Sequence, residues 1–211
     1  MADVERQWFI AGRWQEYEGE ARANLLRVIA VAAFYAVELA TFHGLKIGGF
    51  EIPRPQDASQ GFFYAVTALS VVWTLLALVI AYCLRRHYFP AGLKYLSCSV
   101  DLILLTTVLL LANGPRSPLL VGYFLIICLA ALRFSLLLVW FTTAGAAVGY
   151  LVLLAYARWY ATRDMQVARY QEAIFLIGLV LCGVTIGQVL RRVRRFADDY
   201  ARRLHPTGGP S

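Results

Sequence analysis

The fold is decided by residues 95–140, YLSCSVDLILLTTVLLLANGPRSPLLVGYFLIICLAALRFSLLLVW. Two apolar runs flank the stretch GPRSP at residues 114–118, and Arg133 follows the second run. Closely spaced glycine and proline residues end helices, so this pattern indicates two helices joined by a tight turn. We therefore expect a helical hairpin in a lipid bilayer, with a second bend at residues 133–135 that sends the chain back across.

The overall composition favours lipid over water as the surroundings of this chain. Of its 211 residues, 60% are hydrophobic and only 16% are charged, whereas a soluble domain carries about 25% charged residues. The mean hydropathy is +0.60. The four cysteines lie inside apolar runs and form no CxxC pair, so they read as small buried side chains: Cys83, Cys98, Cys128 and Cys182.

Apolar runs near the length of about 20 residues that a membrane helix needs predict an all-α, polytopic bundle of six spans. They cover residues 24–42, 62–84, 93–112, 119–132, 136–155 and 173–190. The fourth run is short, and we expect Ser117, Pro118 and a snorkelling Arg133 to complete it. In the five-span alternative, residues 119–140 form one helix with Arg133 buried. We favour six spans because an unpaired guanidinium is costly to bury.

The charges predict the orientation and the domain limits. Six spans place 14 of the 20 Lys and Arg residues on the side of the termini, which predicts cytoplasmic termini in a bacterial inner membrane. This asymmetry accounts for the net charge of +7 without nucleic-acid binding. We expect an interfacial or solvated segment at residues 1–22, a transmembrane domain at 23–190, and a basic juxtamembrane helix with a tail at 191–211.

Ionisable residues inside spans are the default candidates for function. Glu38 and Asp101, with Arg133 at the turn, could bind a cation, relay a proton or face a polar ligand. In the structural alternative, Ser97 or a basic group on a neighbouring span holds Asp101, and Glu38 reaches the interface. The histidines offer no pair at matching depth for haem, and no HExxH, GxSxG or P-loop spacing occurs. We therefore expect no enzyme activity, no cofactor and no metal site.

Small residues mark predicted helix contacts. Gly145 and Gly149 in the fifth span, and Gly183 and Gly187 in the sixth, have the GxxxG spacing that lets two helix backbones approach closely. We favour packing within one bundle over dimerisation.

The last span continues into a basic segment without a helix breaker. Leu190, Val193, Ala197, Tyr200 and Leu204 recur at the 3–4 spacing of a coiled-coil seam, which predicts a surface for a protein partner. The alternative is a basic helix held at anionic headgroups by its arginines.

Part of the chain resembles a known class of membrane domain. The stretches SPLL at 117–120, YFL at 123–125 and AALRFS at 130–135 resemble the membrane-embedded N-terminal regions of some bacterial sensor histidine kinases and nucleotide cyclases. The resemblance implies a six-span sensor without its kinase or cyclase domain, either standing alone or as the membrane part of a longer protein.

We accordingly expect a non-enzymatic sensory or regulatory module that signals through its cytoplasmic C-terminal helix. Its expected partners are the lipid bilayer and either another protein or a second copy of the chain. Two alternatives remain open at this point. One is an accessory subunit of a larger membrane complex, and the other is a small ion-coupled transporter that uses Glu38 and Asp101.

Overall fold

The computed structural model describes residues 2–43, 46–47, 50–51, 60–86, 92–112, 114–160 and 167–204. Within this part of the chain, the α-helices are α1 (Ala2–His43), α2 (Gln60–Arg85), α3 (Leu93–Leu111), α4 (Val121–Ala131), α5 (Leu136–Trp159) and α6 (Arg169–Leu204). Two short 3₁₀ helices, η1 (Gly114–Arg116) and η2 (Pro118–Leu120), precede α4. Two-residue strands β1 (Lys46–Ile47) and β2 (Phe50–Glu51) pair antiparallel. The predicted all-α class is confirmed.

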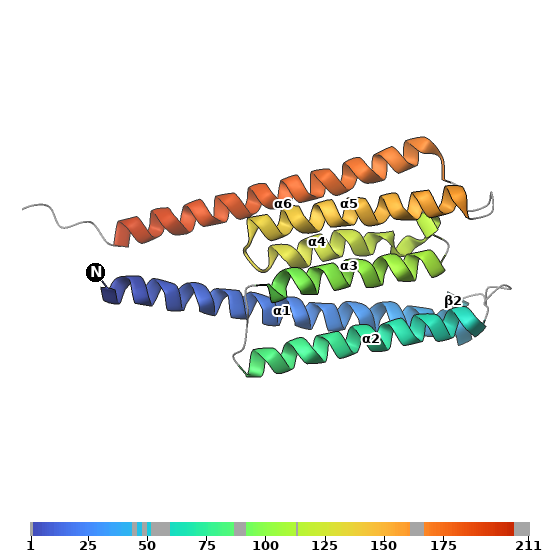
Figure 1. Ribbon diagram of the computed structural model, residues 1–211, viewed down its shortest axis with the longest axis horizontal. Coiled ribbons are helices and arrows are strands. Elements are labelled where there is room, and N and C mark those ends of the chain that lie inside the picture. Colours follow the sequence, from blue (N-terminus) through green and yellow to red (C-terminus); the bar gives the residue numbers. More distant parts are fainter. Residues whose placement is uncertain are drawn as a thin grey trace, which may run out of the picture.

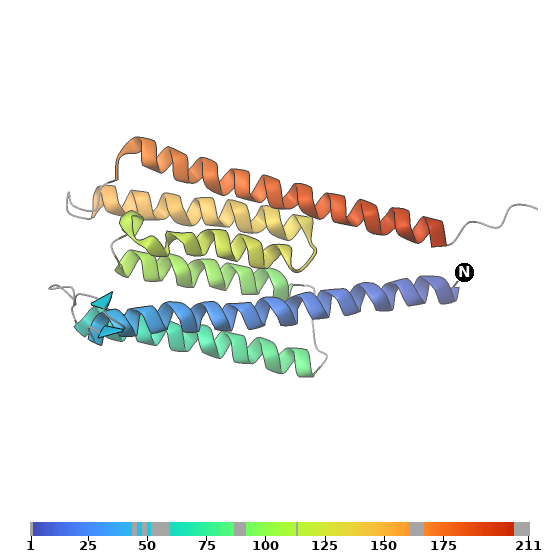
Figure 2. The same cartoon turned by 180° about the vertical axis from the view of Figure 1, so that it is seen from behind.

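The helices lie side by side along one direction, and successive helices run antiparallel (Figure 1). The centre is formed by α3, α4 and α5. The pair α1 and α2 covers one side, and α6 covers the other, where it packs on α5 and α4 (Figures 1 and 2). The resulting architecture is that of a helical membrane bundle.

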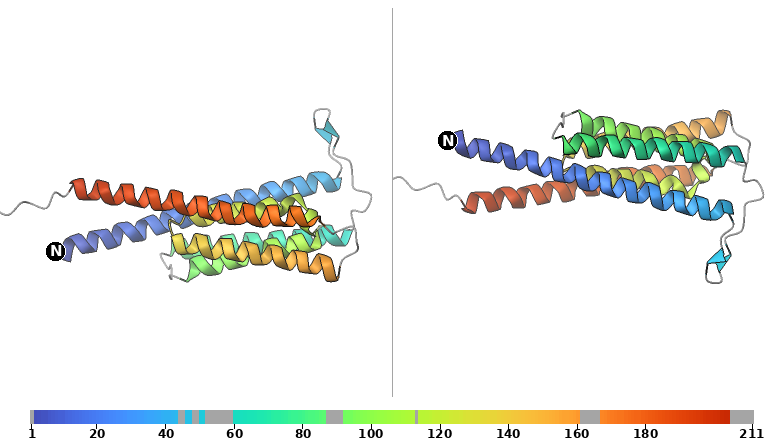
Figure 3. Two further views of the ribbon diagram at one scale, coloured as in Figure 1. Left: turned by 90° about the horizontal axis from the view of Figure 1, so that it is seen from above. Right: turned by 90° about the horizontal axis from the view of Figure 1, so that it is seen from below.

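The first and last helices extend beyond the others at the same end of the bundle (Figure 3). We refer to this end as the terminal end and to the opposite one as the far end. Neither helix contains a proline, which explains why each continues unbroken. At about 1.5 Å per residue, the 42 residues of α1 rise about 63 Å, roughly twice the 30 Å hydrocarbon core of a bilayer.

Five helical segments in the described residues are long and apolar enough to span a membrane: Tyr17–Thr41, Gly61–Arg85, Leu93–Leu111, Leu136–Trp159 and Arg169–Ala197. The segment Pro118–Ala131 is apolar but shorter. Many large apolar side chains point outward from these helices, as lipid contact requires, for example Val37, Leu78 and Leu137. The chain is therefore a multi-pass membrane protein.

Both predicted bends are present. At the first, Gly114 adopts a positive φ of 56°, and the Oγ of Ser117 accepts a hydrogen bond from the Leu119 amide at the start of η2. At the second, Phe134 adopts a positive φ of 49° between α4 and α5. The fourth apolar run is thus a separate short helix rather than part of α5.

The core lies mainly between α3, α4, α5 and α6, where Tyr123, Ile127 and Leu153 are fully buried. The four predicted packing glycines face other helices of the same chain. A Cβ at Gly145 would lie 2.6 Å from Leu102, one at Gly149 would lie 2.8 Å from Thr106, and one at Gly183 would overlap Thr143. A Cβ at Gly187 would lie 3.3 Å from Leu136. These glycines pack the bundle internally.

Several predictions concern residues outside the described part of the chain. The tail from His205, within the predicted segment at residues 191–211, is one of them. The side chains of residues 2–16, on which the predicted interfacial role of residues 1–22 depends, also lie outside it.

Candidate functional site

One face of α1 carries polar residues into the bundle. Glu20, Asn24 and Arg27 are spaced four and three residues apart, so they project from the same side of the helix. All three are buried, with 0%, 7% and 2% of their surfaces exposed. Charged groups at this depth need partners, because an unpaired buried charge is very costly.

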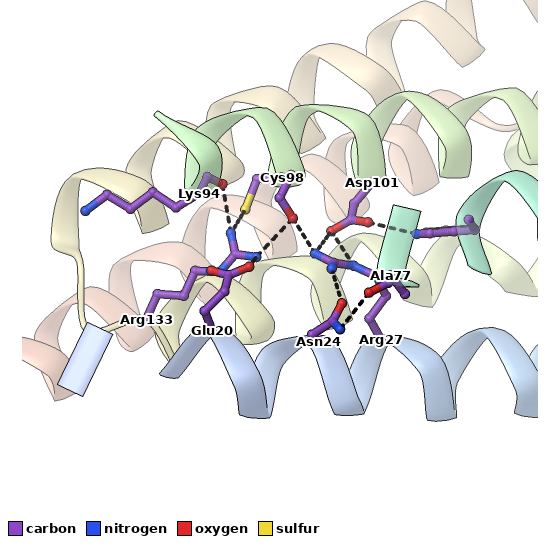
Figure 4. Close-up of polar contacts among 10 residues, drawn as sticks. Glu20, Asn24, Arg27, Ala77, Lys94, Cys98, Asp101 and Arg133 are labelled. Carbon is purple, nitrogen blue, oxygen red and sulfur yellow. Dashed lines mark hydrogen bonds and ion pairs between the residues drawn. The ribbon is translucent and has the colours of Figure 1, made fainter. Parts of the chain in front are cut away.

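Arg27 is paired with Asp101 of α3. Its Nη2 lies 2.7 Å from Asp101 Oδ2, and its Nε donates to the same oxygen at 3.1 Å (Figure 4). The other carboxylate oxygen, Oδ1, accepts from the indole Nε1 of Trp73 in α2 at 2.8 Å. Asp101 is thus bonded through both oxygens. Of the two predicted partners, Ser97 and a basic group on a neighbouring span, the basic group is the one that holds Asp101.

Asn24 connects this pair to α2. Its Oδ1 accepts from Arg27 Nη1 at 2.8 Å, and its Nδ2 donates to the carbonyl of Ala77 at 3.0 Å. One amide side chain thereby joins the Arg27–Asp101 pair to the backbone of α2.

Arg133, at the turn between α4 and α5, forms the second pair with Glu20. Its Nε lies 2.7 Å from Glu20 Oε2, and its Nη2 donates to Oε1 at 2.7 Å. Nη1 donates to the Lys94 carbonyl at 2.8 Å and to Cys98 Sγ at 3.0 Å (Figure 4).

The prediction that Arg133 snorkels to the membrane surface is wrong. Its surface is only 4% exposed, because Glu20 supplies a counter-charge inside the bundle. The sequence argument assumed that Arg133 had no partner. With Glu20 in place, a short fourth helix and a buried arginine are compatible.

Ser97 of α3 joins the two ion pairs. Its Oγ accepts from Arg27 Nη2 at 2.5 Å and from Arg133 Nη2 at 3.1 Å. Two arginines and two carboxylates therefore form one buried cluster whose formal charges cancel. We call it the ion-pair network; its members are Glu20, Asn24, Arg27, Trp73, Ser97, Cys98, Asp101 and Arg133.

Close backbone approach brings α1 to the turn that carries Arg133. A Cβ at Gly19 would lie 2.5 Å from the carbonyl oxygen of Leu132, a distance that a real side chain does not tolerate. Glycine at this position lets Glu20, the next residue, reach Arg133. The same turn contacts α6, because Arg194 donates a hydrogen bond to the carbonyl of Phe134.

A cavity of about 690 Å³ lies against the network, between α1, α2, α3 and α4. Arg27 and Asp101 line one end of it, and Thr41 and Ser117 line the other. Glu38 also lines the cavity and, within the described residues, forms no hydrogen bond or ion pair.

No protein-family model, curated protein or solved structure matches this chain.

The structure separates the predicted site residues into three groups. Asp101 and Arg133 belong to one network, whereas Glu38 lies apart in the cavity wall. Val193 and Ala197 are exposed on the part of α6 beyond the bundle. Tyr200 and Leu204 lie in α6, but their side chains are outside the described part, as are those of the three histidines. Among described residues, no group of three or more His, Cys, Asp or Glu residues is placed to hold a metal ion.

Sequence reasoning missed Glu20, Asn24, Arg27 and Trp73. A signal for the first three was present, since they share one face of the helix where its apolar stretch begins. Trp73 offered no such signal, because a tryptophan in a span is usually an apolar or interfacial residue.

Proposed function

We propose that this chain is a non-enzymatic sensory or regulatory membrane module that signals through the extension of α6 beyond the bundle. The proposal rests chiefly on one continuous set of contacts. It begins at Asp101 in the cavity wall, continues through Arg27 and Ser97 to Arg133, and reaches α6 through the bond between the Phe134 carbonyl and Arg194.

This arrangement suits a switch because its central member is a single hydroxyl. Ser97 Oγ serves both guanidinium groups, and hydrogen bonds weaken steeply when distance or angle changes. A ligand that shifts α1 against α3 would alter the Arg27 bond first. The position of Arg133 would follow, and with it the α4–α5 turn that Arg194 contacts.

In this proposal the chain crosses the membrane six times and has both termini in the cytoplasm of a bacterial cell. The antiparallel course of α4 between α3 and α5 supports the sixth crossing (Figure 1). The arginine-rich extension of α6 lies at the terminal end, which the positive-inside rule places in the cytoplasm. The resemblance of residues 117–135 to bacterial sensor regions implies the same role.

The geometry gives less support to an ion-coupled transporter. Such a carrier would use Asp101 as a free carboxylate, but both oxygens of Asp101 are engaged, and its charge is balanced by Arg27. A role that uses the network as a mechanical connection fits these contacts better.

The test is a double-mutant cycle read by hydrogen–deuterium exchange of the α6 extension, residues 191–204, in lipid nanodiscs. Asp101→Asn keeps the shape of the side chain and removes its charge. We expect it to speed amide exchange in this extension roughly two- to tenfold, the loss of about one hydrogen bond. We expect Arg194→Ala to do the same, and the double variant to exchange no faster than Arg194→Ala.

Arg195→Ala is the matched control, since it removes the same charge from the neighbouring exposed position. Residues 174–186 of α6 serve as an internal reference for general loosening. Additive effects of Asp101→Asn and Arg194→Ala, or equal effects of Arg194→Ala and Arg195→Ala, would contradict the proposed connection.

A further inference from the structure

The cavity between α1 and α4 has the dimensions of a ligand site. It extends from the Arg27–Asp101 pair to Thr41 and Ser117 at the far end, and its volume is about 690 Å³. Sites for drug-sized molecules occupy about 300–1,000 Å³ and are mostly apolar with a few polar groups. Val66, Leu105 and Ile126 provide apolar walls here.

The two ends of the cavity differ in charge. At the inner end, Arg27 balances Asp101, whose oxygens accept from Arg27 and Trp73. That end is formally neutral and its hydrogen bonds are internal. Glu38 is the remaining charged residue in the lining and, among the residues described, has no bonding partner. The cavity wall therefore carries a formal charge of about −1 when Glu38 is ionised.

Aromatic side chains share this lining. Phe34, Tyr35, Phe62 and Trp73 all line the cavity, on α1 and α2. Aromatic faces attract cations, and the attraction grows where water is excluded. A carboxylate in a largely apolar lining that includes such rings favours a cation whose remaining surface is apolar. Among the residues that the structure describes, no three His, Cys, Asp or Glu side chains gather to hold a metal ion.

We propose that this cavity binds a lipophilic organic monocation, such as a hydrophobic amine or quaternary ammonium. The charged group lies near Glu38 and the aromatic rings, and the apolar body extends toward the Arg27–Asp101 pair. This assignment rests on the proposed sensory function, because it takes the cation to be the ligand that the sensory module detects in the cavity next to the network.

The first test measures binding of radiolabelled tetraphenylphosphonium to the full-length protein in nanodiscs of zwitterionic lipid, with neutral triphenylphosphine oxide as the comparison probe. We expect Glu38→Gln to weaken binding of the cation by at least about tenfold and to leave the neutral probe unaffected. Glu172→Gln is the matched control. It removes the same charge from α6 at the far end of the bundle, where Glu172 pairs with Arg158 outside this cavity.

The second test fills the cavity without changing its charge. Ala30 lines the cavity, whereas Ala33 on the same helix is exposed and lies outside its lining. We expect Ala30→Phe to reduce binding of tetraphenylphosphonium at least about tenfold, and Ala33→Phe to leave binding unchanged.

Each other outcome overturns the assignment. Equal binding of the neutral probe, unaffected by Glu38→Gln, would show a cavity for an uncharged apolar molecule such as a lipid tail. Equal losses in Glu38→Gln and Glu172→Gln would show attraction by surface charge, and absence of binding would exclude this cation class. Because the exchange cycle of Asp101 and Arg194 uses no ligand, failure here is distinguishable from failure of the proposed signalling path.

Discussion

Each charged residue of the ion-pair network affects stability mainly through its partner, which would stay buried and unpaired if that residue were removed. A buried ion pair contributes little net stability compared with well-packed apolar residues, but removing one partner strands the other and costs about 3–5 kcal/mol. Glu20 and Arg133 fit this description, with 0% and 4% of their surfaces exposed.

We therefore predict that Arg133→Met lowers the free energy of unfolding by about 3–5 kcal/mol, because Glu20 then remains charged and unpaired. The double variant Glu20→Met/Arg133→Met should recover most of that loss. The measurement is unfolding of the purified protein in mixed micelles.

Arg22→Met is the control for that measurement. Arg22 pairs with Glu18 on the same helix, but those side chains are 68% and 52% exposed, so the change should stay within about 1 kcal/mol. A double variant as unstable as Arg133→Met would refute this account of the pair.

The sequence alone identified one charged residue of each ion pair as a candidate site residue. Asp101 and Arg133 attract notice because each is a single charge beside long apolar runs. Their partners could not be assigned, because Arg27 lies 74 residues from Asp101 and Glu20 lies 113 residues from Arg133. Such pairing depends on how the helices pack, which one sequence does not specify.

Among the elements, α6 depends on small residues where it crosses α5. A Cβ at Gly183 would overlap the side chain of Thr143, whereas one at Gly178 would meet Phe124 at an ordinary 3.6 Å. The two glycines are on the same helix and differ mainly in the space around them.

We predict that Gly183→Ala destabilises the bundle by about 1–3 kcal/mol, because α5 and α6 must separate. Gly178→Ala should be neutral or stabilising by up to about 1 kcal/mol, since alanine favours a helix. Thermal unfolding midpoints of the two variants provide the comparison. A larger loss in Gly178→Ala would show that the crossing is not the source of the effect.

The helix ends illustrate what sequence does specify. The described α-helices contain no proline, and helix starts such as Leu93 and Leu136 match the predicted spans. The continuation of α6 beyond its span was predicted from the lack of a helix breaker, whereas the length of α1 was less evident. Charged residues mark the limit of a hydrocarbon span, but they do not interrupt a helix.

For the whole molecule, the central question is the number of crossings. Six crossings place the N-terminus and the α6 extension on one side of the membrane, and five would separate them. The common direction in which α1 and α6 leave the bundle (Figure 3) favours an even number.

We predict that epitope tags fused to both termini are digested together when protease reaches the cytoplasmic face of sealed vesicles, and are protected together in vesicles of the opposite orientation. Immunoblotting reports each tag separately. Opposite fates for the two tags would establish an odd number of crossings.

The distance along the chain between the members of each ion pair has a consequence for biosynthesis. When α1 leaves the ribosome, neither Asp101 nor Arg133 has been made, although Glu20 and Arg27 are already present where the apolar stretch of α1 begins. At about 5–20 residues per second, the 113 residues from Glu20 to Arg133 take roughly 6–23 s to translate. During that interval the charges on α1 depend on water, lipid headgroups or an insertion factor, so α1 reaches its final position only after its later partners arrive.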